Sequence, residues 1–180
     1  MASEQVICTD MDSPIGKMII GSTDKGCCLL EFHDRGGVEK IGLAIEKRYR
    51  KDVVAGKCKS NDVVITQISE YFAGTRTEFD LPLDILGTAF EKSIWQELLA
   101  TKFGKTRSYG EVAAAVGNPQ ASRAVGRANG ANRISIIVPC HRIIEANGNL
   151  RGYGGGLWRK RWLLDHEQKV LSGVEVSLFG

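Results

Sequence analysis

The sequence lacks any apolar run of the roughly 18 residues that a membrane span needs. Residues 1–5 also lack the basic start and apolar core of a secretory signal. Internal repeats and low-complexity tracts are absent as well. These absences lead us to expect a soluble protein inside the cell, in the cytoplasm, or in the nucleus if the source is eukaryotic.

A disulfide framework is missing too. The chain has five cysteines, an odd number, and none of them forms a CxxC pair. This usage is typical of free thiols in a reducing compartment. Cys8, Cys27, Cys28 and His33 are scattered and do not form a convincing set of zinc ligands, so we expect no bound metal.

Net charge is low at +3, but it is distributed unevenly along the chain. Residues 1–88 carry 11 Lys and Arg against 14 Asp and Glu, whereas residues 89–180 carry 13 against 7. A basic half of this kind indicates contact with a polyanion such as nucleic acid. A solvated basic surface is the alternative.

The first half of the chain has the pattern of a small sheet followed by helices. Short alternating runs separated by Ser13–Gly16 and Asp24–Gly26 predict an antiparallel meander. We expect strands at 6–11, 17–22 and 27–32, helices near 38–50 and 62–72, and an extended linker at 75–87. The fold class is therefore α+β, with an N-terminal domain at 1–87 and a mostly helical domain at 88–180.

The second half contains the outline of a helix-turn-helix. After a helix at about 89–102, the segment 108–111 reads as a capping box, with Ser108 and Glu111 capping each other's amides. A short helix then ends at Gly117, and Asn118 with Pro119 is expected to start the next, which runs to about residue 130. Many helical hairpins share this pattern, so it indicates DNA binding only together with the charge.

The expected second helix has a distinctive surface. Arg123 and Arg127 lie on one face at i, i+4 spacing. Its small residues would allow close approach to a nucleic-acid groove or backbone. Packing against the neighbouring helix is the alternative for some of them. The small residues are Ala121, Ser122, Ala124 and Gly126.

A candidate reactive centre lies at Pro139-Cys140-His141-Arg142, flanked by apolar residues on both sides. A nearby base or cation converts a thiol into the nucleophilic thiolate, and His141 could take the proton directly or through water. Glu167 is a carboxylate that could orient the imidazole. However, a buried cysteine is commonly inert, and adjacent side chains in an extended segment point to opposite faces.

Several motifs together resemble one family. Residues 137–143, Ile-Val-Pro-Cys-His-Arg-Ile, look like the active-site signature of the O6-alkylguanine-DNA alkyltransferases. Residues 108–113 and 117–126 resemble that family's helix-turn-helix, and Asn132 stands where it has an Asn hinge. Gly152–Leu157 and 160–167 resemble its binding loop and final helix. The resemblance is close over about residues 89–170 and loose before that.

The resemblance implies DNA repair without a cofactor. A methyl or larger alkyl group would pass irreversibly from O6 of guanine to Cys140, once per protein molecule, with O4 of thymine as a further candidate substrate. The partner would be double-stranded DNA carrying O6-alkylguanine, bound by a monomer. Because a base inside the stack cannot be reached, the damaged nucleotide would be flipped into a pocket.

The resemblance also implies roles for particular residues. Cys140 would attack the alkyl carbon, with His141 taking the thiol proton through water and Glu167 holding His141. Asn132 would brace the turns before Cys140. Tyr109 would crowd the 3′ phosphate and donate a hydrogen bond to the guanine. The residues implied to contact DNA or the base are Arg123, which fills the vacated space, Tyr109, Ala121, Ser122, Gly126, Val138, Tyr153, Gly154 and Gly155.

Some features depart from the family pattern or leave other interpretations open. Trp158 follows the glycine loop, and Gly154 is smaller than the hydroxyl residue that some relatives carry. A helix-turn-helix regulator, or a module that binds lesions without transfer, is an alternative function. A cysteine hydrolase using Cys140, His141 and Glu167 is another, although it leaves the basic helix unexplained.

Overall fold

The computed structural model describes residues 4–175. Contacts divide the chain into two compact units, and the boundary between them in the sequence falls between Leu86 and Gly87. Within the described range, no helix is both long and apolar enough to cross a membrane.

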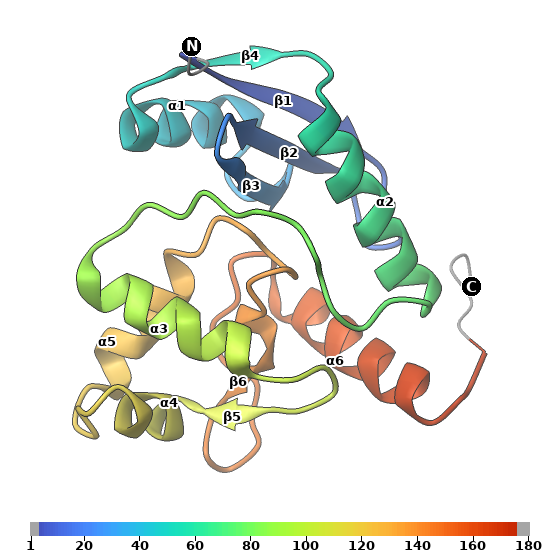
Figure 1. The fold of residues 1–180 in the computed structure, drawn as a ribbon. Coiled ribbons are helices and arrows are strands. Elements are labelled where there is room, and N and C mark those ends of the chain that lie inside the picture. The colour runs from blue at the N-terminus through green and yellow to red at the C-terminus, as the bar shows by residue number, and fades with distance from the viewer. Residues whose placement is uncertain (1–3, 176–180) are drawn as a thin grey trace. The chain divides into compact units, whose positions relative to one another are not determined.

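The first unit is built on a four-stranded sheet in the order β3-β2-β1-β4 (Figure 1). β1 (Gln5–Met11), β2 (Met18–Thr23) and β3 (Gly26–Phe32) form the predicted antiparallel meander. β4 (Asp52–Ala55) pairs parallel to β1 and was not predicted. It is only four residues long and partly exposed, so its hydrophobic pattern is weak.

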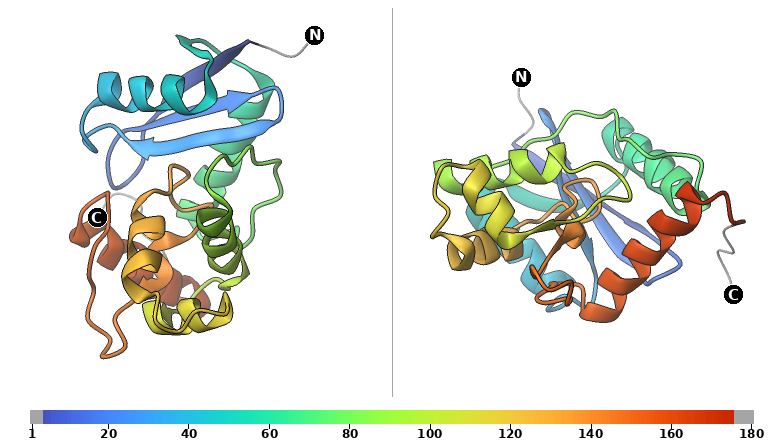
Figure 2. Two further views of the ribbon diagram at one scale, coloured as in Figure 1. Left: turned by 90° about the vertical axis from the view of Figure 1, so that its left-hand side faces the viewer. Right: turned by 90° about the horizontal axis from the view of Figure 1, so that it is seen from below.

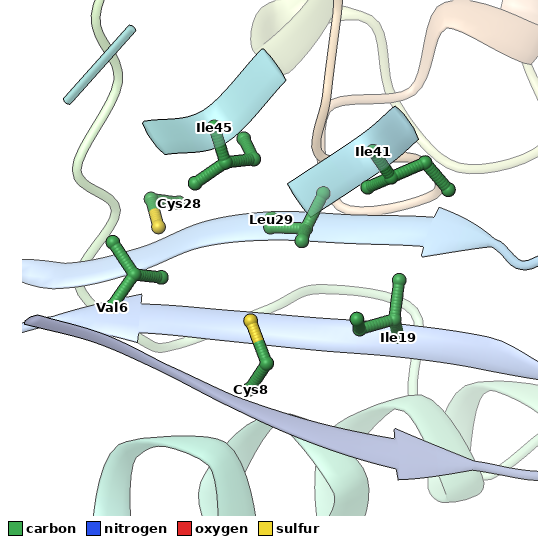
Figure 3. Close-up of a cluster of buried hydrophobic side chains, with 7 residues drawn as sticks. All are labelled: Val6, Cys8, Ile19, Cys28, Leu29, Ile41 and Ile45. Carbon is green, nitrogen blue, oxygen red and sulfur yellow. The ribbon is translucent and has the colours of Figure 1, made fainter. Parts of the chain in front are cut away.

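Two helices cover this sheet and close its core. α1 (Val38–Tyr49) and α2 (Lys59–Ala73) match the predicted helices within three residues at each end. Figure 3 shows Ile41 and Ile45 of α1 over side chains of β1, β2 and β3. Burying such side chains contributes about 1.5–3 kcal/mol each. The cluster consists of Val6, Cys8, Ile19, Cys28, Leu29, Ile41 and Ile45.

The end of the linker, residues 82–84, is hydrogen-bonded to the sheet of the first unit. The Cys27 amide donates to the Pro82 carbonyl at 2.9 Å, and the Asp84 amide donates to the Cys27 carbonyl at 2.8 Å. The Thr23 hydroxyl also donates to the Asp84 carboxylate at 2.5 Å. This short segment therefore extends the sheet beside β3 as a parallel bridge at Leu83.

The second unit is mostly helical and contains the predicted helix-turn-helix. Its helices are α3 (Ala89–Ala100), α4 (Tyr109–Ala115), α5 (Ser122–Gly130) and α6 (Leu157–Leu171). A short parallel pair of strands, β5 (Arg107–Ser108) and β6 (Ile143–Ile144), places the residues just before α4 beside residues 143–144. The chain between β6 and α6 extends as a long loop (Figure 1, Figure 2).

Caps and one long-range bond fix the helices of this unit. The predicted capping box of Ser108 and Glu111 is present at α4, and Thr88 and Glu91 form a second one at α3. The Trp95 indole donates to the carbonyl of Ala128 at 2.9 Å and so ties α3 to α5.

The predicted start of α5 at Asn118 and Pro119 is wrong, because α5 begins at Ser122. Gly117 has a φ of 79°, and the Asn118 amide donates back to the Ala113 carbonyl at 3.0 Å. This is the pattern of a glycine-terminated helix end, so Asn118 finishes α4 rather than capping α5. A turn closed by the Ala121 amide and the Asn118 carbonyl follows.

Candidate functional site

Cys140 lies at the start of a short 3-10 turn, η1 (Cys140–Arg142). Its side chain is buried, with 5% of the residue exposed. The preceding Pro139 has φ −82° and ψ 65°, and the Cys140 amide donates to the Val138 carbonyl at 2.8 Å. Because the chain turns here instead of running as a strand, the expectation that Cys140 and His141 point to opposite faces does not apply.

Asn132 braces the turns that precede Cys140, at the position the sequence indicated. Its side-chain oxygen accepts from the Ile134 amide at 2.9 Å, which fixes which end of the amide is the donor. Its Nδ2 donates to the Val138 carbonyl at 2.9 Å and lies 3.2 Å from Cys140 Sγ. One buried side chain thus contacts both the backbone of the turn and the sulfur.

The backbone between Asn132 and Cys140 is strained at one position. Ile136 is fully buried and has a φ of 72°, a value that branched side chains rarely adopt. The Ile137 amide donates to the Ser135 carbonyl at 2.8 Å, which closes the uncommon form of γ-turn around Ile136. Such strain is usual where the surroundings over-determine a functional segment.

His141, Arg142 and Glu167 form one buried network. His141 Nε2 lies 2.7 Å from Glu167 Oε1. Arg142 donates to both carboxylate oxygens, through Nη2 to Oε1 at 2.9 Å and through Nε to Oε2 at 3.0 Å. The Gly104 amide donates to Oε2 at 2.9 Å. The predicted pairing of Glu167 with His141 is present in this geometry. The two-pronged hydrogen bonding of the Arg142 guanidinium to both carboxylate oxygens, called the fork below, was not predicted.

Burial and charge set the protonation of this network. Burial, the largest effect, lowers the pKa of His141 below its ordinary 6.5, although Glu167 acts in the opposite direction. Burial alone would raise the pKa of Glu167, but His141 and Arg142 outweigh it and hold the pKa well below its usual range. These directions favour a neutral imidazole beside an ionised carboxylate.

Tyr109 and Lys160 meet at one backbone carbonyl near the thiol. The Tyr109 hydroxyl donates to the Arg151 carbonyl at 2.7 Å, and Lys160 Nζ donates to the same oxygen at 3.0 Å and to the Ile143 carbonyl at 2.5 Å. Burial raises the pKa of Tyr109 and lowers that of Lys160 to about 8. Lys160 was not predicted, because a lysine in an exposed-looking basic run gives no sign of burial.

Helix α5 presents the two arginines on an exposed face. Arg123 and Arg127 are exposed, whereas Val125, Ala128 and Asn129 are buried against the rest of the unit. A Cβ on Gly126 would lie 4.0 Å from the Tyr109 ring, an ordinary van der Waals distance, so Tyr109 lies beside this part of the helix. Ala121 and Ser122, at the start of α5, are partly exposed.

The glycine loop leads directly into α6. Tyr153 is partly buried, Gly154 is exposed, and the buried Gly155 accepts a bond from Arg159 Nη1 at 2.9 Å. Trp158 is 57% exposed, with the Arg159 guanidinium 4.7 Å from its ring centroid. By contrast, the Val138 backbone is engaged within the turn: its amide donates to Ile134, and its carbonyl accepts from Asn132 and Cys140.

The cysteines lie apart from any metal-ligand arrangement. None of the cysteines in the described part of the chain forms a disulfide, and Cys8, Cys27 and Cys28 are buried in the first unit. Over residues 4–175, no cluster of three or more His, Cys, Asp or Glu side chains is placed to hold a metal ion.

Both halves of the chain match a known family. Residues 89–169 match the model of the 6-O-methylguanine DNA methyltransferase DNA-binding domain, and residues 6–85 match the model of its ribonuclease-like domain. The chain belongs to the 6-O-methylguanine DNA methyltransferase family. The family resemblance seen in the sequence is thereby confirmed.

Relatives support this membership over nearly the whole chain. The methylated-DNA–protein-cysteine methyltransferase of Mycobacterium leprae is 44% identical over 169 residues, covering 93% of this chain and 96% of that protein. A homologue of the same name from Methanosarcina acetivorans is 41% identical and covers 87% and 94%. Among solved structures, Mycobacterium tuberculosis OGT in complex with DNA is 40% identical, with a TM-score of 0.77 and coverage of 92% and 94%.

Proposed function

We propose that this chain repairs DNA by moving a methyl or larger alkyl group from O6 of guanine onto Sγ of its own Cys140. The observation that carries the proposal is a buried Cys140 thiol followed in the chain by a buried imidazole that a carboxylate holds, in a chain similar to named methylated-DNA–protein-cysteine methyltransferases. Double-stranded DNA carrying the lesion is the partner.

The reaction is a direct displacement at the alkyl carbon. The S–C bond to Cys140 forms as the C–O6 bond breaks, and the thiol proton passes through water to His141. Guanine leaves as an oxyanion that must gain a proton or a donor. Tyr109 can supply the donor once its hydroxyl gives up the Arg151 carbonyl, 2.7 Å away in this structure.

The product explains why each molecule acts once. Cys140 becomes a thioether, a poor leaving group, and nothing in the proposed network returns it to a thiol. The chemistry needs only the chain's own side chains, so we propose a cofactor-free, stoichiometric transfer.

Access to the base requires that the nucleotide leave the duplex. We propose that α5 enters the minor groove, where Arg123 occupies the vacated space and the small Ala121, Ser122 and Gly126 allow close approach. Tyr153, Gly154 and Gly155 would line the pocket together with backbone groups near Val138. The exposed arginines of α5 support this arrangement.

Domain organisation and cellular context follow from the same proposal. We propose that residues 1–87 and 88–180 act as two domains of a monomer, with the reaction and the DNA contacts in the second. The relatives are bacterial and archaeal, where the genome lies in the cytoplasm, and we propose that compartment for the repair.

The decisive experiment measures the intact mass of the protein after mixing with a duplex that carries one O6-methylguanine. We expect a gain of one methyl group per molecule, mapped to the peptide containing Cys140 and saturating at equal amounts of protein and lesion. A control duplex with unmodified guanine should give no gain.

The Cys140→Ser variant separates the alternatives. It should bind the damaged duplex but gain no mass. If wild type binds the lesion tightly yet gains no mass, it is a lesion-binding module. Binding of one undamaged sequence in preference to the lesion would indicate a regulator, and turnover of an ester substrate with a burst would indicate a hydrolase.

A further inference from the structure

The Glu167 carboxylate is shared by two groups that could both be positively charged. Oε1 lies 2.7 Å from His141 Nε2 and 2.9 Å from Arg142 Nη2, while Oε2 accepts from Arg142 Nε at 3.0 Å. His141 and Glu167 are completely buried, and only 6% of Arg142 is exposed. The arginine is thus as close to the carboxylate as the histidine is.

We propose that Arg142 is a positioning residue for alkyl transfer: it shares Glu167 with His141 and thereby keeps the imidazole neutral and able to accept the Cys140 proton. The inference rests on the proposed function only for its consequence in the reaction rate. The protonation state itself can be measured without any transfer.

Arg142 is held so that it cannot leave the carboxylate. Its Nη1 donates to the Thr101 carbonyl at 2.7 Å, and its guanidinium lies 5.6 Å from the Phe103 ring centroid. A guanidinium stays protonated at any pH the fold survives, and its planar fork matches the two carboxylate oxygens. The positive charge beside Glu167 is therefore permanent.

Burial disfavours the imidazolium of His141, and the neighbouring charges act on top of that effect. If Glu167 faced His141 alone, the buried carboxylate would oppose burial by stabilising the imidazolium, and the base would take up a proton at higher pH. With Arg142 in place, carboxylate and guanidinium cancel, so an imidazolium would be an uncompensated buried charge. Lys160 of α6 acts on His141 in the same direction as Arg142, while Glu167 opposes both.

The same arrangement selects the tautomer of the ring. An ionised carboxylate only accepts hydrogen bonds, so the neutral ring places its proton on Nε2 toward Glu167. Nδ1 then carries the lone pair. This atom is buried and has no hydrogen-bond partner among the described residues, which leaves it available for the thiol proton.

The test is an NMR titration of protein with 15N-labelled histidine. The chain has three histidines, and His33, which pairs with Asp10 in the first unit, serves as an internal reference. In wild type we expect His141 to remain neutral below its ordinary pKa. In Arg142→Met, its pKa should rise by about one unit or more, because Glu167 loses its compensating charge. An unchanged or lowered pKa in the folded variant would overturn the proposal.

Two further variants guard against a simple packing defect. Arg142→Lys keeps the charge but loses the fork, so the pKa of His141 should stay below 6.5; a rise above that value contradicts the charge argument. Arg142→Met combined with Glu167→Gln removes both charges and should return the pKa to a low value. Arg107→Met, which breaks the separate ion pair with Glu97, is the matched control and should leave His141 unchanged.

The kinetic measurement follows the pH dependence of the single-turnover rate. In Arg142→Met the acid limb should move to higher pH by the same amount as the imidazole titration. A uniform loss of rate at every pH, with an unshifted limb, would show that Arg142 has only a structural role. If no variant transfers an alkyl group, the proposed function fails while the titration still tests the charge argument.

Discussion

Gly104 follows Phe103 in the loop after α3, where the backbone angle disfavours a side chain. Its φ is 73°, and a Cβ would lie 2.0 Å from Cδ1 of Leu171, a side chain that is 55% exposed and can move aside. Its amide also supports Glu167. Gly104→Ala should therefore destabilise the protein by roughly the 1–2 kcal/mol that a left-handed residue costs.

Gly148→Ala is the matched control for that substitution. Gly148 has a φ of 85°, but no atom lies within 4 Å of the position that a Cβ would take, so only the conformational cost applies. Urea unfolding followed by tryptophan fluorescence compares the two. A loss at Gly104 several times larger than the loss at Gly148 would contradict the expectation that Leu171 moves aside.

Arg123 is the residue of α5 for which a specific kinetic effect is expected. It is exposed, so Arg123→Ala should leave the fold intact. If it fills the space of the flipped nucleotide, its loss should slow repair of duplex DNA by about tenfold, or about 1.4 kcal/mol. Repair of O6-methylguanine in a single strand, where no flipping is needed, should change little.

Arg127→Ala removes the same charge one turn along α5 and serves as the comparison. It should weaken binding and reduce the salt dependence of the affinity without the same loss in the duplex rate. Equal kinetic effects of the two variants would show that both arginines act only through the phosphates.

At the level of elements, the two capping boxes should contribute similar stability. Ser108→Ala and Thr88→Ala each remove the side-chain acceptor at a helix start, for a loss of about 1 kcal/mol. Because the caps lie on different helices, the double variant should lose the sum. The shift of the denaturation midpoint, at an unchanged dependence of the free energy of unfolding on denaturant, measures this loss. A loss in the free energy of unfolding below about 0.3 kcal/mol would contradict the role of the cap.

Local patterns in the sequence predicted most of these elements. The meander, both helices of the first unit and the capping box at Ser108 depend on neighbours in the chain, and all are confirmed. β4 was missed because its strand pairing is supplied by β1, about 47 residues away. The start of α5 was wrong because Asn118 is equally suited to ending one helix and beginning the next.

The site shows the same limit. The signature around Cys140 pointed to the thiol, the imidazole and their carboxylate, although their separate roles stay predictions. Neither the fork from Arg142 nor the burial of Lys160 could be predicted. Both depend on α6 packing against η1, a contact between segments distant in sequence. Exposure of a charged side chain is decided by such packing, and residue type alone does not reveal it.

On the scale of the whole molecule, pH should act on the two units in different ranges. In the second unit, the pKa of His141 lies below its ordinary 6.5, so the unfolded chain binds more protons near that pH. The free energy of unfolding should therefore rise as the pH increases toward and through 6.5. Glu167, whose pKa is lowered, matters only below its ordinary 4.5.

In the first unit, burial raises the pKa of Cys8 to about 11 and that of Cys27 to about 12, from 9.0. The unfolded thiols lose their protons first, so this unit should lose stability above about pH 9. All three tryptophans lie in the second unit and four of the five cysteines in the first. Fluorescence and thiol labelling during denaturation therefore report the two units separately, and identical pH responses would contradict the assignment.

The strained turn at Ile136 has a consequence for how freely this position can vary. Glycine would accept the φ of 72° and relieve about 1–3 kcal/mol, but it would leave a cavity where a fully buried side chain had been, at about 2–5 kcal/mol. Smaller branched residues such as valine would keep the strain and lose packing as well. Strain and packing therefore oppose each other at this position, and replacing isoleucine by a smaller residue relieves the first only by sacrificing the second.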